Sequence, residues 1–125
     1  MRRQHDLDRL RALAALDDEA LAKRIDADSI AAMQRVMVML GADRRASGFP
    51  IDRADFVATV REMDGLCSEG SRSLGAAIVE ASAWGDRKDS ERARAVYERF
   101  LADCRSKFHR EIARYQLRKL GAAGG

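Results

Sequence analysis

Hydrophobic residues recur every three or four positions along most of the chain, which is the spacing of amphipathic helices. The first such segment, about 5–24, carries leucines at positions 7, 10, 13 and 21. The three acids at 17–19 favour the positive start of a helix, so a short second helix can begin there. No stretch has the alternation or the Asn-Gly turn of a β-hairpin, so the pattern predicts no strand.

The segment 28–41 predicts a helix with a wide apolar surface. Asp28 or Ser29 is a suitable N-cap, and Gly41 ends the pattern. Five apolar residues lie on one arc: Ile30, Met33, Val36, Met37 and Leu40. Val38 and Met39 fall outside this arc, so the helix should be central or pressed against a partner. We therefore expect Met33 and Met37 in the core, Met39 at a self-association contact, and a homodimer.

Glycines and serines crowd the segment that follows the loop at 43–51. Three glycines, at positions 65, 70 and 75, are spaced by five. Each costs about 1 kcal/mol relative to alanine inside a helix. We therefore expect a joint between two helices at 65–75, and we expect the second helix, built from small residues, to end at Gly85.

The segment 87–120 has the clearest helical pattern. Its apolar residues step by three or four and form one stripe: Ala93, Tyr97, Leu101, Cys104, Phe108, Ile112 and Tyr115. Gly121 ends the pattern. The elements together predict an all-α fold, a helical bundle of four to five helices with a long C-terminal helix. We expect one domain over 4–120, followed by a disordered C-terminal tail at 121–125.

The composition narrows the class further. A length of 125 residues suits one domain, and a single proline permits long helices. The net charge of +3 is too mild to imply a nucleic-acid partner by itself. The first residues lack the apolar region of a signal peptide, and no run approaches the roughly 18 apolar residues of a membrane span. We expect a cytoplasmic protein with two free thiols and no membrane contact.

The stretch LCSEGSRSLG, at 66–75, has the residue types of a phosphate-binding cysteine loop. Such a loop needs its thiol at a helix N-terminus beside an arginine. Cys67 instead continues the apolar face of the preceding helix, in step with Val60 and Met63, so it should be buried and inert. The helix joint is the favoured interpretation. The alternative is a weak anion site made of Ser71, Arg72 and Ser73.

Metal binding and catalysis find little support in the pattern. The two histidines, His5 and His109, lie far apart, and no Glu-x-x-His pair occurs. We therefore predict no metal, no cofactor and no enzymatic activity. An active site assembled across helices, around Glu80, Arg72 and Cys67, is the competing hypothesis.

A row of cations along the last predicted helix is the strongest functional signal. Four of them fall within an arc of about 80°: Lys107, Arg110, Arg114 and Arg118. Arg92 and Arg99 extend the row upstream. Val96 and Phe100 lie on or beside the same arc, which a merely solvated face does not explain. A solvated face with intrahelical ion pairs is the competing interpretation.

The pattern therefore predicts a non-catalytic helical interaction module of the adaptor, regulator, chaperone or toxin-neutralising type. It would dock a protein partner with an acidic surface through a stripe of seven residues: Arg92, Arg99, Phe100, Lys107, Arg110, Arg114 and Arg118. The alternative is a DNA- or RNA-associated accessory protein that contacts the phosphate backbone with the same stripe. Its affinity would then fall steeply with salt.

Overall fold

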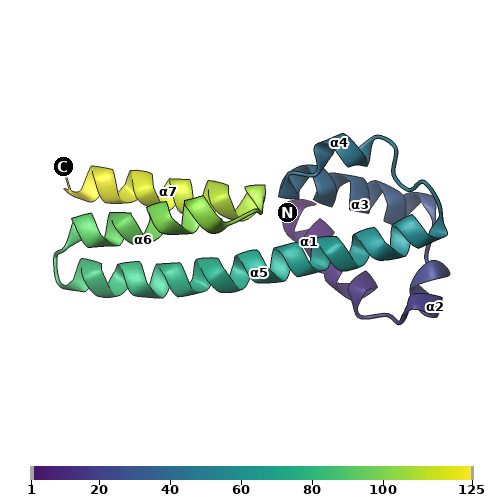
Figure 1. Cartoon of the computed structure of the whole chain (residues 1–125), viewed down its shortest axis with the longest axis horizontal. Helices are drawn as coiled ribbons and strands as arrows, with labels where there is room; N and C mark the ends of the chain where they lie inside the picture. Colours follow the sequence, from purple (N-terminus) through teal and green to yellow (C-terminus); the bar gives the residue numbers. More distant parts are fainter. Residues whose placement is uncertain (1, 125) are drawn as a thin grey trace. The chain divides into compact units, whose positions relative to one another are not determined.

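The computed structural model describes residues 2–124, and the side chains of residues 3–121. Within them the chain is all-α without a strand, as the apolar pattern predicts. The helices are α1 (Arg2–Ala14), α2 (Asp18–Ala22), α3 (Ala27–Leu40), α4 (Asp43–Ala46), α5 (Arg53–Asp86), α6 (Ser90–Asp103) and α7 (Lys107–Gly124) (Figure 1). The described residues form seven helices rather than four to five. The short helix expected at the acids of 17–19 is α2, whereas α4 lies in the predicted loop at 43–51 and the last predicted helix is divided.

The chain divides into two compact units, residues 1–67 and residues 68–125. They are called the N-terminal unit and the C-terminal unit below. Helix α5 begins in the N-terminal unit and ends in the C-terminal unit. The single domain over 4–120 stays a prediction.

The core of the N-terminal unit comes from α1, α2, α3 and the first half of α5. Its large buried side chains are Leu10, Leu13, Leu21, Met33, Val36, Met37, Leu40, Phe56, Val60 and Met63. The prediction that Met33 and Met37 lie in the core is confirmed. Because most of this core is aliphatic or methionine, the aromatic contribution is small, and Phe49 and Phe56 stack with ring centroids 5.7 Å apart.

Helix α3 has a defined cap at each end. The Asp26 carboxylate accepts a hydrogen bond of 2.7 Å from the Ser29 backbone N–H, and this bond lowers the pKa of Asp26. The predicted caps, Asp28 and Ser29, lie instead inside the first turn, so that prediction is wrong by two to three residues. Gly41 ends the helix as predicted, with a φ of 96° that favours glycine.

Arg61 of α5 closes the C-terminal end of α1. Its guanidinium donates to the carbonyl oxygens of Ala14 and Leu16, at 2.5 and 2.6 Å, and forms an ion pair of 2.9 Å with Asp18. The last carbonyls of a helix have no partner within the helix. Arg61 therefore supplies the donors that the end of α1 lacks.

The predicted joint at 65–75 is wrong, because α5 runs without interruption from Arg53 to Asp86. Buried residues on both sides of the glycines hold the helix in place: Met63, Cys67, Leu74, Ala77 and Ala81. Their burial outweighs the helix cost of the glycines, which is about 1 kcal/mol each. The expected end at Gly85 is one residue short of the observed end.

The C-terminal unit consists of the second half of α5 with α6 and α7, which run side by side (Figure 1). Its buried hydrophobic residues are Leu74, Ala77, Ala81, Ala93, Val96, Tyr97, Phe100 and Ala113. Five partly buried residues from α6, α7 and the connection between them pack against this cluster: Leu101, Cys104, Ile112, Leu117 and Leu120. Four alanines among the eight buried residues allow the three helices to approach closely.

The single long helix predicted over 87–120 is wrong, because the chain leaves helical geometry at Cys104 and α7 begins at Lys107. Cys104 is extended, with a ψ of 130°. The Ser106 hydroxyl then accepts from the backbone N–H of His109 at 3.4 Å, as a helix cap does. The break also shifts the apolar face of α7, so Tyr115 of the predicted stripe is 52% exposed.

The C-terminal residues continue α7. The helix passes the predicted end at Gly121 and runs to Gly124, and Gly125 lies outside the described residues. The disordered tail at 121–125 stays a prediction. Among the helices that the structure describes, none combines the length and the apolarity that crossing a bilayer requires.

Candidate functional site

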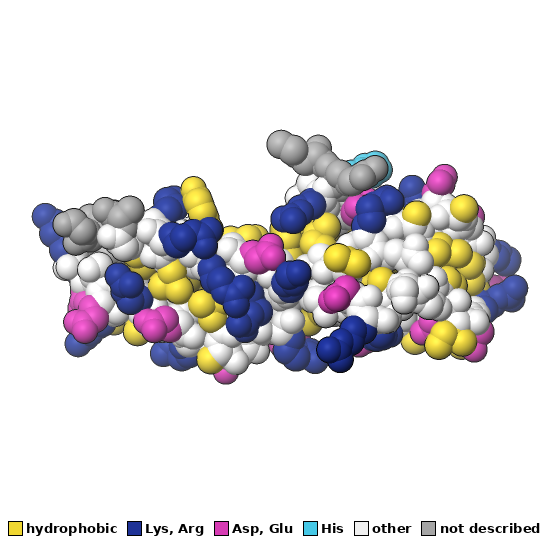
Figure 2. Space-filling model, turned by 90° about the horizontal axis from the view of Figure 1, so that it is seen from above, with side chains coloured by type: hydrophobic (Ala, Val, Ile, Leu, Met, Phe, Trp, Pro, Cys, Tyr) yellow, Lys and Arg dark blue, Asp and Glu magenta, His cyan; other side chains and the backbone are white. Residues whose placement is uncertain are grey.

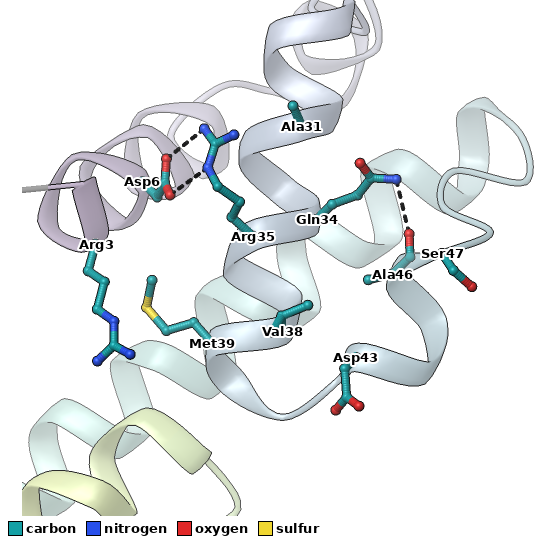
Figure 3. Close-up of a pocket in the computed structure, with 10 residues that line it drawn as sticks. All are labelled: Arg3, Asp6, Ala31, Gln34, Arg35, Val38, Met39, Asp43, Ala46 and Ser47. Atoms are coloured by element: carbon teal, nitrogen blue, oxygen red, sulfur yellow. Dashed lines mark hydrogen bonds and ion pairs between the residues drawn. The ribbon is translucent and has the colours of Figure 1, made fainter.

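An open groove lies over α3 in the N-terminal unit, between α1 and α4, with a volume of about 910 Å³ (Figure 3). Its apolar lining comes from Ala31, Val38, Met39 and Ala46. Arg3 extends from α1 on one side of Val38 and Met39, and Asp43 lies at the start of α4 on the other side (Figure 3). The apolar floor of the groove thus lies between the cation of Arg3 on the α1 side and the carboxylate of Asp43 on the α4 side.

Hydrogen bonds fix both walls of the groove to α3. On the α1 side, Arg35 donates to both carboxylate oxygens of Asp6, at 2.8 and 3.0 Å. Asp6 is 2% exposed, and this bond raises the pKa of Arg35. On the α4 side, the Gln34 amide donates to the carbonyl oxygens of Ala46 and Phe49, at 3.0 and 3.3 Å. The groove therefore exists before any partner binds.

The apolar residues outside the core arc of α3 lie in this groove. Val38 is 47% exposed, and Met39 is half-buried beside it. The pattern singled out these two positions because they do not share the face of Met33 and Met37. Self-association through Met39 stays a prediction.

A second surface is formed by four exposed cations of α7, called the α7 basic face: Lys107, Arg114, Arg118 and Lys119. At about 100° per residue, the first three lie within an arc of about 40°. No acid among the described residues forms an ion pair with them. Tyr115 lies between them in sequence, its ring centroid 6.0 Å from Arg118 and 5.5 Å from Lys119.

The upstream part of the predicted stripe lies on a separate helix and is engaged there. Arg99 forms an ion pair of 3.2 Å with Glu80 of α5, and Arg92 forms one of 3.4 Å with Asp89. Arg92 also lies over the Trp84 ring, 4.6 Å from its centroid. Because α6 and α7 are separate helices, the stripe of seven residues is not continuous.

Two further residues of the predicted stripe are corrected. Phe100 is 7% exposed and packs with Val96 in the core of the C-terminal unit, so neither offers an apolar contact to a partner. Arg110 donates to the carbonyl oxygens of Leu101 and Cys104, which are left without helical partners by the break after α6. Of the predicted stripe, Lys107, Arg114 and Arg118 are exposed and form no ion pair with the described acids.

The positive charge is concentrated in the C-terminal unit. Residues 68–125 contain twelve Lys and Arg against eight Asp and Glu, whereas residues 1–67 contain eleven against twelve. Within α7, five cations stand against the single acid Glu111. Figure 2 shows Lys and Arg side chains gathered on the face to which α6 and α7 contribute.

The predicted anion site of Ser71, Arg72 and Ser73 loses its physical basis. It required a helix N-terminus after Gly70, and these residues lie in the middle of α5, where the backbone N–H groups are used in the helix. All three side chains are exposed. The hydroxyl of Ser71 is instead 3.1 Å from Nε2 of His109.

His109 joins two serines in the C-terminal unit. Its ring is 3% exposed, with Nε2 at 3.1 Å from the Ser71 hydroxyl and Nδ1 at 2.6 Å from the Ser106 hydroxyl. Gly70 makes room for the ring, because a Cβ at that position would lie 2.5 Å from Nδ1. The pattern missed this contact. The serine three residues before His109 was its one local signal.

The order of serine, histidine and serine is that of a nucleophile, a base and an orienting group. Acyl transfer also needs N–H donors aimed at the developing oxyanion. Ser71 lies within α5, whose backbone N–H groups are already bonded to carbonyls one turn earlier. The arrangement therefore fits a structural role, in which the hydrogen bonds of His109 lock the start of α7 against α5.

The other catalytic candidates are separated from this network or engaged. Cys67 is 8% exposed, as predicted, and burial raises the pKa of its thiol, which keeps it protonated and unreactive. Glu80 is half exposed and pairs with Arg99. Within the described residues, no three His, Cys, Asp or Glu side chains gather where they could hold a metal ion.

We expect the free energy of unfolding to fall as the pH drops below about 6.5, the ordinary pKa of histidine. Burial lowers the pKa of His109, so the unfolded chain binds a proton at a higher pH than the folded chain. Unfolding therefore takes up a proton between 6.5 and the folded-state pKa, whereas above 6.5 the contribution is constant. Urea unfolding at pH values from 7.5 to 5 measures the slope, and His109→Gln should reduce it. An unchanged slope in that variant would assign the effect to other groups.

No family model, curated protein or solved structure matches the chain. The groove over α3 and the α7 basic face are therefore the two surfaces from which a function is inferred.

Proposed function

We propose that the chain is a non-catalytic interaction module that binds an acidic protein surface through the α7 basic face. The observation that carries this proposal is the group of Lys107, Arg114 and Arg118, exposed within an arc of about 40° and without an acidic partner among the described residues. Arg114 and Arg118 are one helical turn apart, so their like charges repel each other, and an acidic partner relieves that repulsion.

A protein partner is favoured over nucleic acid by the size and composition of this face. Lys107 and Arg118 are eleven residues apart, so the face extends about 16 Å along the helix. A few phosphate contacts over that length give weak, salt-sensitive binding. Tyr115, 52% exposed beside Arg118, adds the combination of tyrosine and arginine that is enriched at the energetic centres of protein interfaces.

The cytoplasm is the location that we propose for this module, since both cysteines are free and a reducing compartment keeps them so. The homodimer predicted through Met39 stays an alternative for the exposed side of α3, which a measurement of the oligomeric state decides.

Reversing two charges of the α7 basic face should weaken partner binding at least about tenfold, or about 1.4 kcal/mol. The variant is Arg114→Glu with Arg118→Glu. Both side chains are exposed, so the melting temperature should change little. The measurement is capture of partners from native cell extract, identification of the dominant partner, and titration of that partner against wild type and variant.

A matched control carries the same change of charge elsewhere. Arg44→Glu with Arg53→Glu reverses two exposed cations of the N-terminal unit and should bind as the wild type does. Equal losses in the two variants would mean that net charge, and not this face, controls binding. Titration of a 20-base-pair DNA duplex at two salt concentrations tests the alternative. Binding to the duplex that depends on Arg114 and Arg118, without a protein partner, would replace the proposal by the nucleic-acid function.

A further inference from the structure

Val38 is an exposed aliphatic residue on a helix that is otherwise the centre of the N-terminal core. The side chains of Met33, Val36 and Met37 are at most 1% exposed, whereas Val38 is 47% exposed. Exposed hydrophobic side chains also appear over α3 and α4 in Figure 2. Covering Val38 and the neighbouring Met39 would remove apolar surface from water at about 25 cal/mol per Å².

The groove around Val38 is rigid because its walls are bonded to its floor. The Asp6–Arg35 pair holds α1, and the bonds from Gln34 to Ala46 and Phe49 hold α4. A partner entering it therefore does not bear the entropy of ordering the site. The groove is also open to solvent, so a compact small molecule would bury little of its own surface there.

We propose that this groove binds an amphipathic helix of a partner protein. The helix would place small and aliphatic residues on Val38 and Met39, an acidic residue beside Arg3, and a basic residue beside Asp43. The charge complementarity follows from the two walls, since Arg3 and Asp43 lie on opposite sides of the apolar floor (Figure 3). A helix laid in a groove with its apolar face inward is a recurrent mode of peptide recognition.

A partner helix suits this surface better than a second copy of the same groove. The surface is concave, and two concave surfaces placed face to face leave a void between them. The convex side of a helix fills the depression between α1 and α4. The groove lies on the N-terminal unit and shares no residue with the α7 basic face, so the two proposals stand or fall separately.

A synthetic helix with defined flanks tests the groove. The probe is a fluorescein-labelled 18-residue peptide with a leucine and alanine stripe, glutamates along one flank and lysines along the other. Fluorescence anisotropy measures its binding to the full chain. Val38→Glu should weaken binding at least tenfold, because a carboxylate would be buried against the stripe. Val79→Glu, which alters a valine that is 71% exposed in the C-terminal unit, should leave binding unchanged.

Charge exchange between the walls sharpens the test. Arg3→Glu and Asp43→Lys should each weaken binding about threefold to tenfold, because each gives both walls the same sign. The double exchange restores opposite walls, and the peptide can lie in the reverse direction, so it should regain most of the wild-type affinity. If the single exchanges had no effect, or if Val38→Glu and Val79→Glu bound alike, the proposal would be overturned.

Sedimentation of the wild type and of Val38→Glu distinguishes a partner helix from a second copy of the chain as the occupant of the groove. A wild-type dimer that Val38→Glu dissociates would assign the groove to self-association and would overturn the partner helix. A monomer in both cases, with peptide binding lost in Val38→Glu, supports it. The Arg114→Glu, Arg118→Glu variant should bind the peptide as the wild type does, whichever way the α7 test comes out.

Discussion

Gly70→Ala is expected to destabilise the protein by about 1 kcal/mol net, although alanine is the better helix former. An added Cβ would lie 2.5 Å from Nδ1 of His109 and 2.8 Å from its Cγ. The ring cannot turn away freely, because Ser71 and Ser106 hold its two nitrogens. Overpacking of this kind costs about 1–3 kcal/mol, which exceeds the helix gain of up to about 1 kcal/mol. Urea unfolding followed by circular dichroism measures the change.

Gly75 supplies the matched control on the same helix. A Cβ at Gly75 would meet nothing within 4 Å, so Gly75→Ala should stabilise α5 by up to about 1 kcal/mol. The two variants should therefore shift the unfolding midpoint in opposite directions. The double variant Gly70→Ala, His109→Ala removes the obstructing ring, so its cost should be less than the sum of the two single costs. A shift in the same direction for Gly70→Ala and Gly75→Ala would refute the lock.

The contrast between these two glycines shows why the pattern misplaced the break in this chain. Helix propensity treats Gly65, Gly70 and Gly75 alike, and their density predicted a joint at 65–75. The structure continues α5 through all three. Gly70 allows a close approach of His109, which lies 39 positions away in the chain. The sequence alone does not indicate that these two residues are in contact.

The break at 104–106 was not predicted, because the segment lacks the residues that usually interrupt a helix. It contains neither glycine nor proline, and the apolar residues keep their spacing through Cys104 and Phe108. Two residues determine the break. Ser106 caps the start of α7, and Arg110 donates to a carbonyl oxygen at the end of α6. Both residue types are common inside helices. Local periodicity therefore predicted the helical class and the core face of α3, because both depend on residues within one helix. It did not predict the break after α6, which depends on hydrogen bonds from the side chains of Ser106 and Arg110.

The same distinction between contacts within one helix and contacts between helices applies to the candidate surfaces. Lys107, Arg114 and Arg118 share a helix, so helical geometry alone placed them on one arc. The partners of Arg99 and Arg105 are Glu80 and Glu69, which lie 19 and 36 residues away in the chain. Exposed ion pairs of this kind stabilise a protein by about 0–1 kcal/mol. Because the partners are far apart in the chain, no local pattern of residues predicts these pairs. The pattern placed Val38 and Met39 outside the core arc of α3, but it did not predict the groove around them, because the walls of that groove come from two other helices.

Replacing Arg35 with methionine is expected to lower the free energy of unfolding by about 2 kcal/mol. Asp6 is 2% exposed, and both of its oxygens accept from Arg35. Removing one partner of a buried pair costs about 3–5 kcal/mol, and the 41% exposure of the Arg35 side chain reduces that cost by admitting water. Arg35→Lys keeps the charge and loses the two-pronged geometry, so it should cost about half as much. Thermal and urea unfolding measure both variants.

Neutralising the acid as well should recover much of this loss, because Asp6→Asn leaves no charge in the vacated site. If the cost of Arg35→Met with Asp6→Asn equalled the sum of the two single costs, the pair would not be coupled and the explanation would fail. The same pair holds the α1 wall of the groove, so Arg35→Met should also weaken the peptide probe. Val38→Glu should weaken the probe while leaving the unfolding midpoint close to that of the wild type, because Val38 lies outside the core. The two variants thus separate a residue that builds the groove from a residue that contacts its occupant.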